Sequence, residues 1–191
     1  MEKNAVMDLL IKTGALLTGH FRLSSGKHSD KYIQCALLLQ WPEHANYIAN
    51  EMGKKFPDKK IDIVIGPAIG GITLAYETAR VFKARGLWTE RKEDKMILSR
   101  GFKIEKGENV LVVEDVITTG GSVSEVIGLV EELGGNIIGV SSIINRANAT
   151  EIKGYPFKSL LKLDFKTFEP ESCPLCEKGF EIYSPGSRKA L

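Results

Sequence analysis

The sequence lacks the features that mark several large classes of protein. It has three cysteines in 191 residues, too few for the disulfide framework of a small secreted domain. No apolar run approaches the ~18–20 residues of a membrane-spanning helix. The 26 basic and 24 acidic residues nearly cancel, so the composition predicts no dominant basic face of the kind that binds nucleic acid. Without internal repeats or low-complexity tracts, the chain has the composition of a globular protein with one sizeable core.

The N-terminal segment also lacks the traits of a signal peptide. The stretch MEKNAVMDLLIKTGALL (1–17) has the pattern of an amphipathic helix, without a cationic start, a long apolar core or a small-residue cleavage site. We therefore expect a cytoplasmic protein.

Two of the cysteines raise the question of a metal. Cys173 and Cys176 form CPLC, which has the spacing of half a zinc knuckle. A structural zinc site needs four ligands, and the remaining candidates are scattered along the chain: Cys35, His20, His28 and His44. The shortage of partners favours a reduced cysteine pair in a C-terminal turn, with a metal site as the alternative.

Apolar strands alternate with amphipathic helices from about residue 60 onward. We expect strands at 61–66, 109–115 and 136–145 and helices at 71–86 and 122–133, with Ser122 and Glu125 as a capping box; segment 95–102 fits either a strand or an ordered part of a loop. This alternation predicts an α/β fold, a parallel sheet flanked by helices. Residues 1 to about 50 and about 150 to 191 do not join the alternation, so we expect a core at about 50–150 and a small hood formed by both chain ends.

The most informative stretch is VLVVEDVITTGGS (110–122). Four apolar residues run into two carboxylates, and then into a threonine and glycine turn ahead of a helix. Ligands collect at the carboxyl ends of parallel strands, and glycines allow successive N–H groups to face an anion at a helix N-terminus. Neither G-x-G-x-x-G nor G-x-x-x-x-G-K-[ST] is present. The order suits a phosphorylated sugar, although a solvated acidic strand end remains the alternative.

This stretch resembles the phosphoribosyl-diphosphate motif of the type I phosphoribosyltransferases. Three further segments resemble the orotate phosphoribosyltransferases within that family: GHFRLSSGKHSDKYIQC (19–35), ERKEDK (90–95) and NRAN (145–148). With CPLC and PGSR near the end, the resemblance covers essentially the whole chain as a single phosphoribosyltransferase domain. It implies transfer of phosphoribose from 5-phospho-α-D-ribose 1-diphosphate to orotate, giving orotidine 5'-monophosphate and diphosphate in pyrimidine biosynthesis.

The resemblance also assigns roles to residues. Lys95, Asp115 and Arg91 are expected to act in catalysis, and Thr118, Arg146, Lys27 and Tyr32 to contact orotate, with Ser25 nearby. Tyr32 fits a core aromatic equally well. The expected contacts to phosphoribosyl diphosphate are Arg91, Lys92, Lys95, Glu114, Asp115, Val116, Ile117, Thr118, Thr119, Gly120, Gly121 and Ser122. We expect Mg²⁺ to be held mainly by the substrate, and a homodimer that shares a mobile loop at 90–103 across subunits. The turn IGPAIGG (65–71) is expected to face the diphosphate.

Three positions depart from the family pattern. Ser24 stands where some members have lysine, Ile97 where they have histidine, and Gly70 where a lysine is frequent. These differences leave the contacts to the leaving group open. Two other functions remain as alternatives: transfer to another base, and a non-catalytic regulator that senses phosphoribosyl diphosphate.

Overall fold

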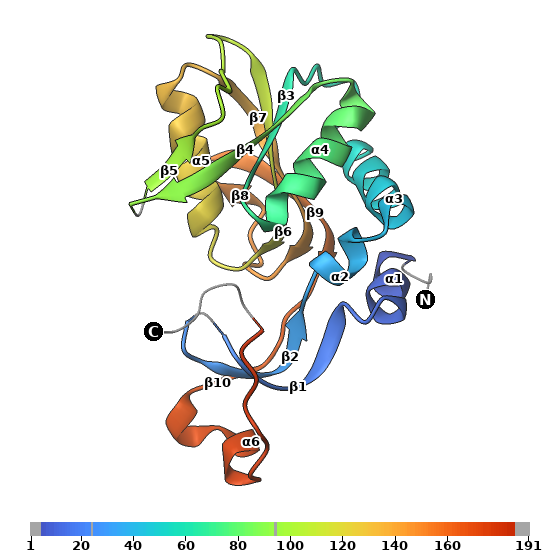
Figure 1. Cartoon of the computed structure of the whole chain (residues 1–191), viewed down its shortest axis with the longest axis vertical. Coiled ribbons are helices and arrows are strands. Elements are labelled where there is room, and N and C mark those ends of the chain that lie inside the picture. Colours follow the sequence, from blue (N-terminus) through green and yellow to red (C-terminus); the bar gives the residue numbers. More distant parts are fainter. Residues whose placement is uncertain (1–4, 24, 94, 186–191) are drawn as a thin grey trace. The chain divides into compact units, whose positions relative to one another are not determined.

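The computed structural model describes residues 5–23, 25–93 and 95–185, and these residues form two compact units (Figure 1). The larger unit comprises residues 39–163, and the smaller one comprises residues 1–38 together with 164–191. Predictions that concern Met1–Asn4, Ser24, Asp94 and the GSR of PGSR lie outside the described residues.

The larger unit is built on a seven-stranded sheet in the order β5-β4-β3-β6-β7-β9-β8. The five inner strands run parallel, and the edge strands β5 and β8 pair antiparallel with β4 and β9. The strands are β3 (Ile63–Pro67), β4 (Arg85–Lys92), β5 (Lys95–Leu98), β6 (Asn109–Ile117), β7 (Asn136–Asn145), β8 (Glu151–Ile152) and β9 (Tyr155–Lys162). The predicted α/β fold with a largely parallel sheet is confirmed.

Helices cover both faces of this sheet (Figure 1). Helices α3 (Pro42–Gly53) and α4 (Gly70–Phe82) pack together on one face, and α5 (Gly121–Glu132) packs on the other. Because side chains alternate along a strand, Val110 and Val112 of β6 join the core beneath α5. Both are fully buried, which explains why β6 has an almost entirely apolar sequence.

Several boundaries differ from the sequence-based expectation. The predicted helix at 71–86 ends at Phe82, because Lys83 adopts a left-handed conformation with φ of 54°. The chain then enters β4, a strand that the sequence analysis did not predict. Helix α3 and strands β8 and β9 belong to the larger unit, which therefore extends beyond the expected range of about 50–150. Strand β9 was not predicted, because only Phe157 and Leu161 of its residues are buried and its sequence therefore lacks a clear apolar pattern.

The smaller unit contains a three-stranded antiparallel sheet with β2 (His28–Ile33) in the middle. Strand β1 (Leu16–Arg22) lies on one side of it and β10 (Thr167–Phe168) on the other. The predicted N-terminal helix is shorter than expected: α1 spans Ala5–Lys12. The short elements α2 (Ala36–Leu39), η1 (Pro170–Ser172) and α6 (Pro174–Glu177) complete the fold. This unit thus combines both chain ends, as a hood would.

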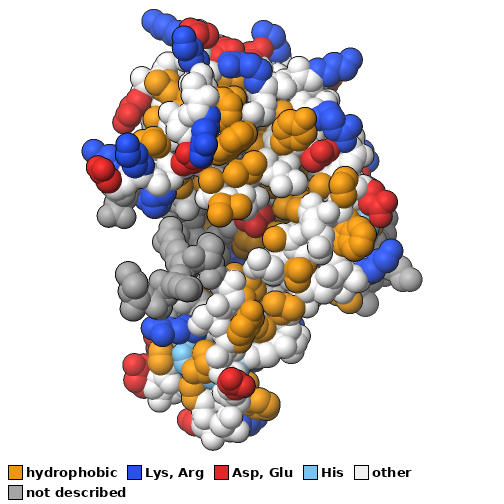
Figure 2. All heavy atoms as spheres, in the orientation of Figure 1, with side chains coloured by type: hydrophobic (Ala, Val, Ile, Leu, Met, Phe, Trp, Pro, Cys, Tyr) orange, Lys and Arg blue, Asp and Glu red, His pale blue; other side chains and the backbone are white. Residues whose placement is uncertain are grey.

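Charged side chains of both signs are interspersed over the face of the molecule that Figure 2 shows. This agrees with the near balance of acidic and basic residues in the sequence. Among the described residues, no helix combines the length and apolar character required to cross a bilayer.

Candidate active site at the carboxyl end of strand β6

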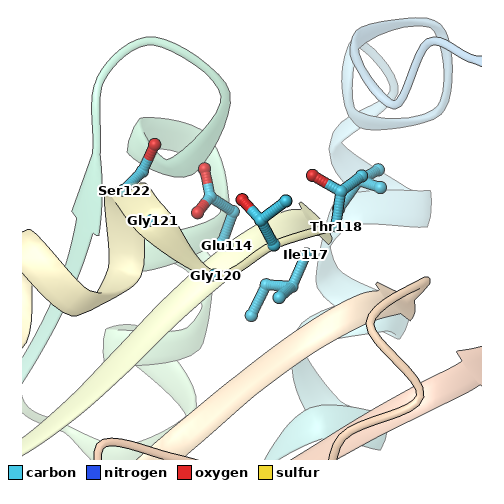
Figure 3. Close-up of a pocket in the computed structure, with 8 residues that line it drawn as sticks. Glu114, Ile117, Thr118, Gly120, Gly121 and Ser122 are labelled. Carbon is cyan, nitrogen blue, oxygen red and sulfur yellow. The ribbon is translucent and has the colours of Figure 1, made fainter. Parts of the chain in front are cut away.

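The acidic pair lies where β6 leaves the core. Glu114 and Asp115 are both partly buried, and they follow four fully buried residues of the same strand. Because side chains alternate along a strand, the two carboxylates leave the backbone toward opposite faces of the sheet. Glu114 lines a small open pocket together with residues 116–122 (Figure 3). Asp115 accepts a hydrogen bond from the Val116 N–H at 2.8 Å.

Burial changes the acidity of this pair. It raises the pKa of Glu114 to about 8, and the neighbouring charge of Asp115 adds to the effect. Burial also raises the pKa of Asp115, although the Val116 N–H partly offsets this rise. Glu114 is therefore largely protonated at neutral pH in the ligand-free chain. A neutral carboxyl group can both donate a hydrogen bond to a sugar hydroxyl and accept one from it.

The threonine and glycine turn joins β6 to the N-terminus of α5. Gly120 adopts a left-handed conformation with φ of 77°, and its carbonyl accepts the Ser124 N–H at 2.8 Å. In Figure 3 the Glu114 carboxylate and the Ser122 hydroxyl lie on the same side of the turn. The first N–H groups of a helix have no acceptor within the helix, and the helix dipole attracts an anion to them. The turn therefore suits a phosphate group.

The predicted capping box is wrong. Helix α5 begins at Gly121, its N-cap is Gly120, and no side chain caps it by a hydrogen bond. Glu125 instead accepts a hydrogen bond from Arg91 Nη2 at 2.8 Å, a contact that no local sequence pattern predicts. The N–H groups at the start of α5 thus receive no acceptor from a capping side chain.

Arg146 lies at the same edge of the sheet as the turn. It follows β7 directly, and its backbone N–H donates to the carbonyl of Ile117 at 2.8 Å. Strand β7 pairs with β6 in parallel, with Asn145 opposite Ile117. The structure therefore brings Arg146 next to the phosphate turn, as expected from the position of NRAN after a strand.

The segment predicted as a mobile loop at 90–103 is largely a β-hairpin. Strands β4 and β5 pair antiparallel, with Glu90 opposite Ile97 and Lys92 opposite Lys95. The first of the two alternatives for 95–102, a strand, is correct for residues 95–98. Lys92 and Lys95 are exposed near the tip of the hairpin. Both charges are therefore solvated in the ligand-free chain. The predicted contact with the diphosphate leaving group does not require either lysine to be buried before the substrate binds.

Glycines allow a close approach between β3, the turn after it and β6. A Cβ atom on Gly66 would lie 2.8 Å from the carbonyl oxygens of both Gly71 and Val113, so no side chain fits there. A Cβ atom on Gly70 would lie 3.0 Å from an Asp115 carboxylate oxygen. The turn in IGPAIGG is therefore close to the acidic pair. A larger residue at position 70 would therefore require the Asp115 carboxylate to move.

The remaining predicted residues belong to the smaller unit. Lys27 is exposed and forms an ion pair with Glu169 at 2.6 Å. Tyr32 is partly buried, and its ring packs against Phe21 with the centroids 5.7 Å apart. The face of the Tyr32 ring toward Phe21 is therefore packed as in a core aromatic residue. Ser25 is exposed.

Comparisons with known proteins agree with this geometry. The family model for the phosphoribosyl transferase domain matches residues 37–174. Orotate phosphoribosyltransferase of Caldicellulosiruptor bescii is 53% identical over 189 residues, which cover 99% of this chain and 100% of the relative. Orotate phosphoribosyltransferase of Thermotoga maritima is 50% identical over 183 residues, which cover 96% of this chain and 98% of the relative.

Solved structures show the same fold. Orotate phosphoribosyltransferase from Aeropyrum pernix is 26% identical with a TM-score of 0.70, over 83% of this chain and 93% of that one. Adenine phosphoribosyltransferase from Thermoanaerobacter pseudethanolicus has a TM-score of 0.61 at 18% identity, over 70% of this chain and 88% of that one, so this likeness concerns the fold alone. The matched domain, the full-length relatives and the acidic strand end with its phosphate turn agree, and the chain belongs to the phosphoribosyl transferase family, among the orotate phosphoribosyltransferases.

Proposed function

We propose that this protein transfers phosphoribose from 5-phospho-α-D-ribose 1-diphosphate to orotate, giving orotidine 5'-monophosphate and diphosphate. The observation that carries the proposal is the edge at which β6 and β7 end. It combines an acidic pair, a turn suited to an anion at the start of α5, and an arginine directly after the neighbouring strand. A sugar phosphate and a carboxylated base together require these three kinds of group.

The turn supports binding of the 5'-phosphate. Its donors are the N–H groups of residues 118–122 and the hydroxyls of Thr118, Thr119 and Ser122, and the dipole of α5 adds a positive potential. Because Glu114 lines the same pocket, its carboxyl group lies within the region that the ribose attached to that phosphate would occupy. We assign the ribose hydroxyls to Glu114 and Asp115.

Arg146 supports recognition of orotate. A guanidinium group is planar and always charged, and it can bind a carboxylate through two parallel hydrogen bonds. Orotate carries a carboxylate, whereas uracil, hypoxanthine and adenine do not. Thr118 is the proposed second contact from this edge, and Lys27 and Tyr32 remain proposed contacts on the basis of the family resemblance.

The reaction needs no nucleophilic side chain. A ring nitrogen of orotate forms the new bond to the anomeric carbon of ribose as the bond from that carbon to the diphosphate oxygen breaks, and the electron pair leaves with the diphosphate. The proton of that nitrogen is released to the solvent. Positive charge develops on the ribose ring, and negative charge develops on the leaving group. We assign neutralisation of the latter to Arg91, Lys92 and Lys95 of the β4–β5 hairpin. The chain then acts by orientation and electrostatics.

The donors at this edge fit Mg²⁺. Mg²⁺ prefers oxygen ligands and binds through one or two carboxylates together with substrate phosphates. We propose no direct protein ligand: the ion is held mainly by oxygens of the diphosphate and of the ribose, whose hydroxyls Glu114 and Asp115 bind. When bound, the ion would neutralise charge on the diphosphate. Two copies of this chain that share the hairpin across subunits are proposed as the active assembly.

A comparison of acceptor bases tests the proposal. We expect turnover with phosphoribosyl diphosphate, Mg²⁺ and orotate, and at least ~100-fold lower kcat/KM with uracil, hypoxanthine or adenine, because these bases leave Arg146 without its carboxylate partner. Preference for any of these three bases would contradict the assignment. Absence of turnover together with tight binding of phosphoribosyl diphosphate would instead support the alternative of a regulator.

A further inference from the structure

Four possible metal ligands meet within the smaller unit, and none of them is assigned to the transfer reaction. They are His20 of β1, His28 at the start of β2, and Cys173 and Cys176 at the start and within α6. One ligand atom from each residue, two ring nitrogens and two sulfurs, lies within 4.8 Å of every other. The sequence suggested that the cysteine pair lacks further metal ligands. That expectation is wrong, because the fold of this unit brings His20 and His28 to the cysteine pair.

Four of the six distances between these ligand atoms are close to the edge lengths of a tetrahedral zinc site. His20 Nε2 lies 3.0 Å from His28 Nδ1, 3.5 Å from Cys173 Sγ and 3.7 Å from Cys176 Sγ. Cys176 Sγ lies 3.3 Å from His28 Nδ1. Bond lengths of about 2.0 Å from zinc to nitrogen and about 2.3 Å from zinc to sulfur give tetrahedron edges of about 3.3–3.8 Å. The two remaining distances are at most 4.8 Å, so shifts of about 1 Å or less would let the four atoms surround one ion.

The other ring nitrogen of His20 is already held by the backbone. His20 Nδ1 lies 2.9 Å from the carbonyl oxygen of Phe180. A carbonyl can only accept, so Nδ1 carries the proton, and the lone pair of the neutral ring is on Nε2, which faces the cluster. Metal-binding histidines are commonly oriented in this way by a backbone carbonyl.

The segment that carries the cysteines is attached by hydrogen bonds and one ion pair but buries little apolar surface. Of the described residues 164–185, Cys173 is the only one that is buried, with 1% exposure. His20 and His28 are each 4% exposed, so three of the four side chains are withdrawn from solvent. A segment that buries so little apolar surface gains little hydrophobic stabilisation, and small domains frequently replace a missing core with a metal.

We propose that His20, His28, Cys173 and Cys176 bind one zinc ion, which fastens the segment 164–185 to the β1–β2 hairpin. Two nitrogen and two sulfur ligands in a tetrahedral arrangement favour zinc over Mg²⁺, which prefers oxygen. All four positions are filled by the protein, which is typical of a structural site and leaves no open position for a substrate. The site is therefore separate in both chemistry and role from the Mg²⁺ proposed for the transferase reaction.

Metal analysis of the full-length protein tests this proposal. The protein is purified under reducing conditions from medium that contains zinc, and its zinc content is measured by mass spectrometry. We expect about one zinc per chain. The chain offers a matched control, because Cys35 is a third cysteine of the same unit that is also buried. Cys176→Ser and His28→Gln should each lose most of the zinc, whereas Cys35→Ser should retain it.

A second measurement covers the case in which the ligand variants fail to fold. Wild-type protein is prepared with cobalt in place of zinc, and its absorption spectrum is recorded. Intense visible bands of tetrahedral cobalt with a thiolate charge-transfer band are expected. Folded wild-type protein that contains no zinc and gives no such spectrum would overturn the proposal. Equal zinc content in wild type and Cys176→Ser would do the same, and so would a disulfide between Cys173 and Cys176 that persists under these reducing conditions.

Discussion

At the scale of single residues, the site depends on two carboxylates at the end of one strand. Glu114 and Asp115 leave the core where β6 still pairs with β7, and burial leaves both carboxyl groups poorly solvated. Burial raises the pKa of both, that of Glu114 to about 8. Ionising either carboxyl group in the ligand-free chain therefore costs free energy. Ribose hydroxyls could donate hydrogen bonds that replace the missing water.

The first prediction concerns Glu114→Gln and stability. The pKa of Glu114 in the folded chain lies above its ordinary value of 4.5, so the folded state holds a proton that the unfolded state releases between about pH 5 and pH 8. Over that range the wild type loses stability as pH rises. The variant should lose less, and at pH 7 it should be more stable by on the order of 1–3 kcal/mol. Denaturant unfolding at several pH values measures this.

An exposed glutamate provides the control for that experiment. Glu131 pairs with Lys153 and Tyr155, and these two hydrogen bonds lower its pKa. Glu131→Gln should therefore leave the slope of stability against pH between pH 5 and pH 8 almost unchanged. A slope in Glu114→Gln that equals that of the wild type would contradict the account of the buried pair.

A second prediction at this scale concerns Arg146→Lys. Lysine keeps the charge but cannot form two parallel hydrogen bonds with a carboxylate. A loss of about 1.5–3 kcal/mol is typical for a charge-assisted contact, so the KM for orotate should rise roughly 10–100-fold, with little change in the KM for phosphoribosyl diphosphate. Arg85→Lys is the control, since Arg85 pairs with Glu108 at the amino end of β4. An equal rise in both KM values would contradict the assignment of Arg146 to orotate.

At the scale of elements, the start of α5 is the proposed phosphate site. Gly120 supplies the left-handed conformation that turns the chain from β6 into the helix. The absence of a capping side chain leaves that end of the helix open to an external anion. A well-capped α5 would be a more stable helix and a poorer phosphate site.

The third prediction is that Gly120→Ala weakens phosphate binding. A Cβ atom there would meet Ile152 at an ordinary distance of 3.6 Å, so the cost comes from the positive φ, about 1 kcal/mol of stability. The shifted turn should weaken binding of phosphoribosyl diphosphate roughly tenfold or more. Gly107→Ala is a matched control, because Gly107 has φ of 84° and open space around it before β6 begins. It should cost similar stability with unchanged binding, as measured by calorimetry. Equal binding by both variants would refute the role of the turn.

Elements with a strong local pattern could be predicted from the sequence. The apolar run of β7 was predicted with its observed bounds, and β6 needed only Val116 and Ile117 added. The acidic pair and phosphate turn were predicted because they are contiguous. Strand β4 could not be predicted, because its pattern merges with the preceding helix until Lys83 reverses the backbone. The ion pair of Arg91 with Glu125 and the cluster around His20 depend on contacts between distant segments.

At the scale of the whole molecule, the chain divides into two units with different chemistry. The larger unit contains the acidic pair, the phosphate turn, Arg146 and the cationic hairpin. The smaller unit contains Lys27, Tyr32 and the proposed zinc site. The fold class was predictable from the alternation of strands and helices. The bounds of the two units were not, because α3 packs on β7 and β9, which lie far from it in sequence, and because β9 has only two buried residues.

The fourth prediction tests whether the β4–β5 hairpin acts across subunits. Lys95→Ala should lower kcat at least ~100-fold, because the developing charge on diphosphate loses a partner, while orotate binding changes little. Asp115→Asn should also lower kcat/KM, because it weakens the proposed contact between residue 115 and the ribose hydroxyls. If the hairpin serves the neighbouring subunit, mixing the two variants with subunit exchange should restore about a quarter of wild-type activity, since half the dimers then contain one intact site. No recovery on mixing would place the hairpin in its own subunit, and Lys60→Ala is the control for loss of an exposed lysine.

The central claim is that the turn at 118–122 binds the 5'-phosphate while Glu114 and Asp115 bind the ribose hydroxyls. A crystal structure with orotidine 5'-monophosphate tests it most directly. We expect phosphate density within hydrogen-bond distance of the N–H groups at the start of α5, and the orotate carboxylate against Arg146. Phosphate density at any other place on the chain would contradict it.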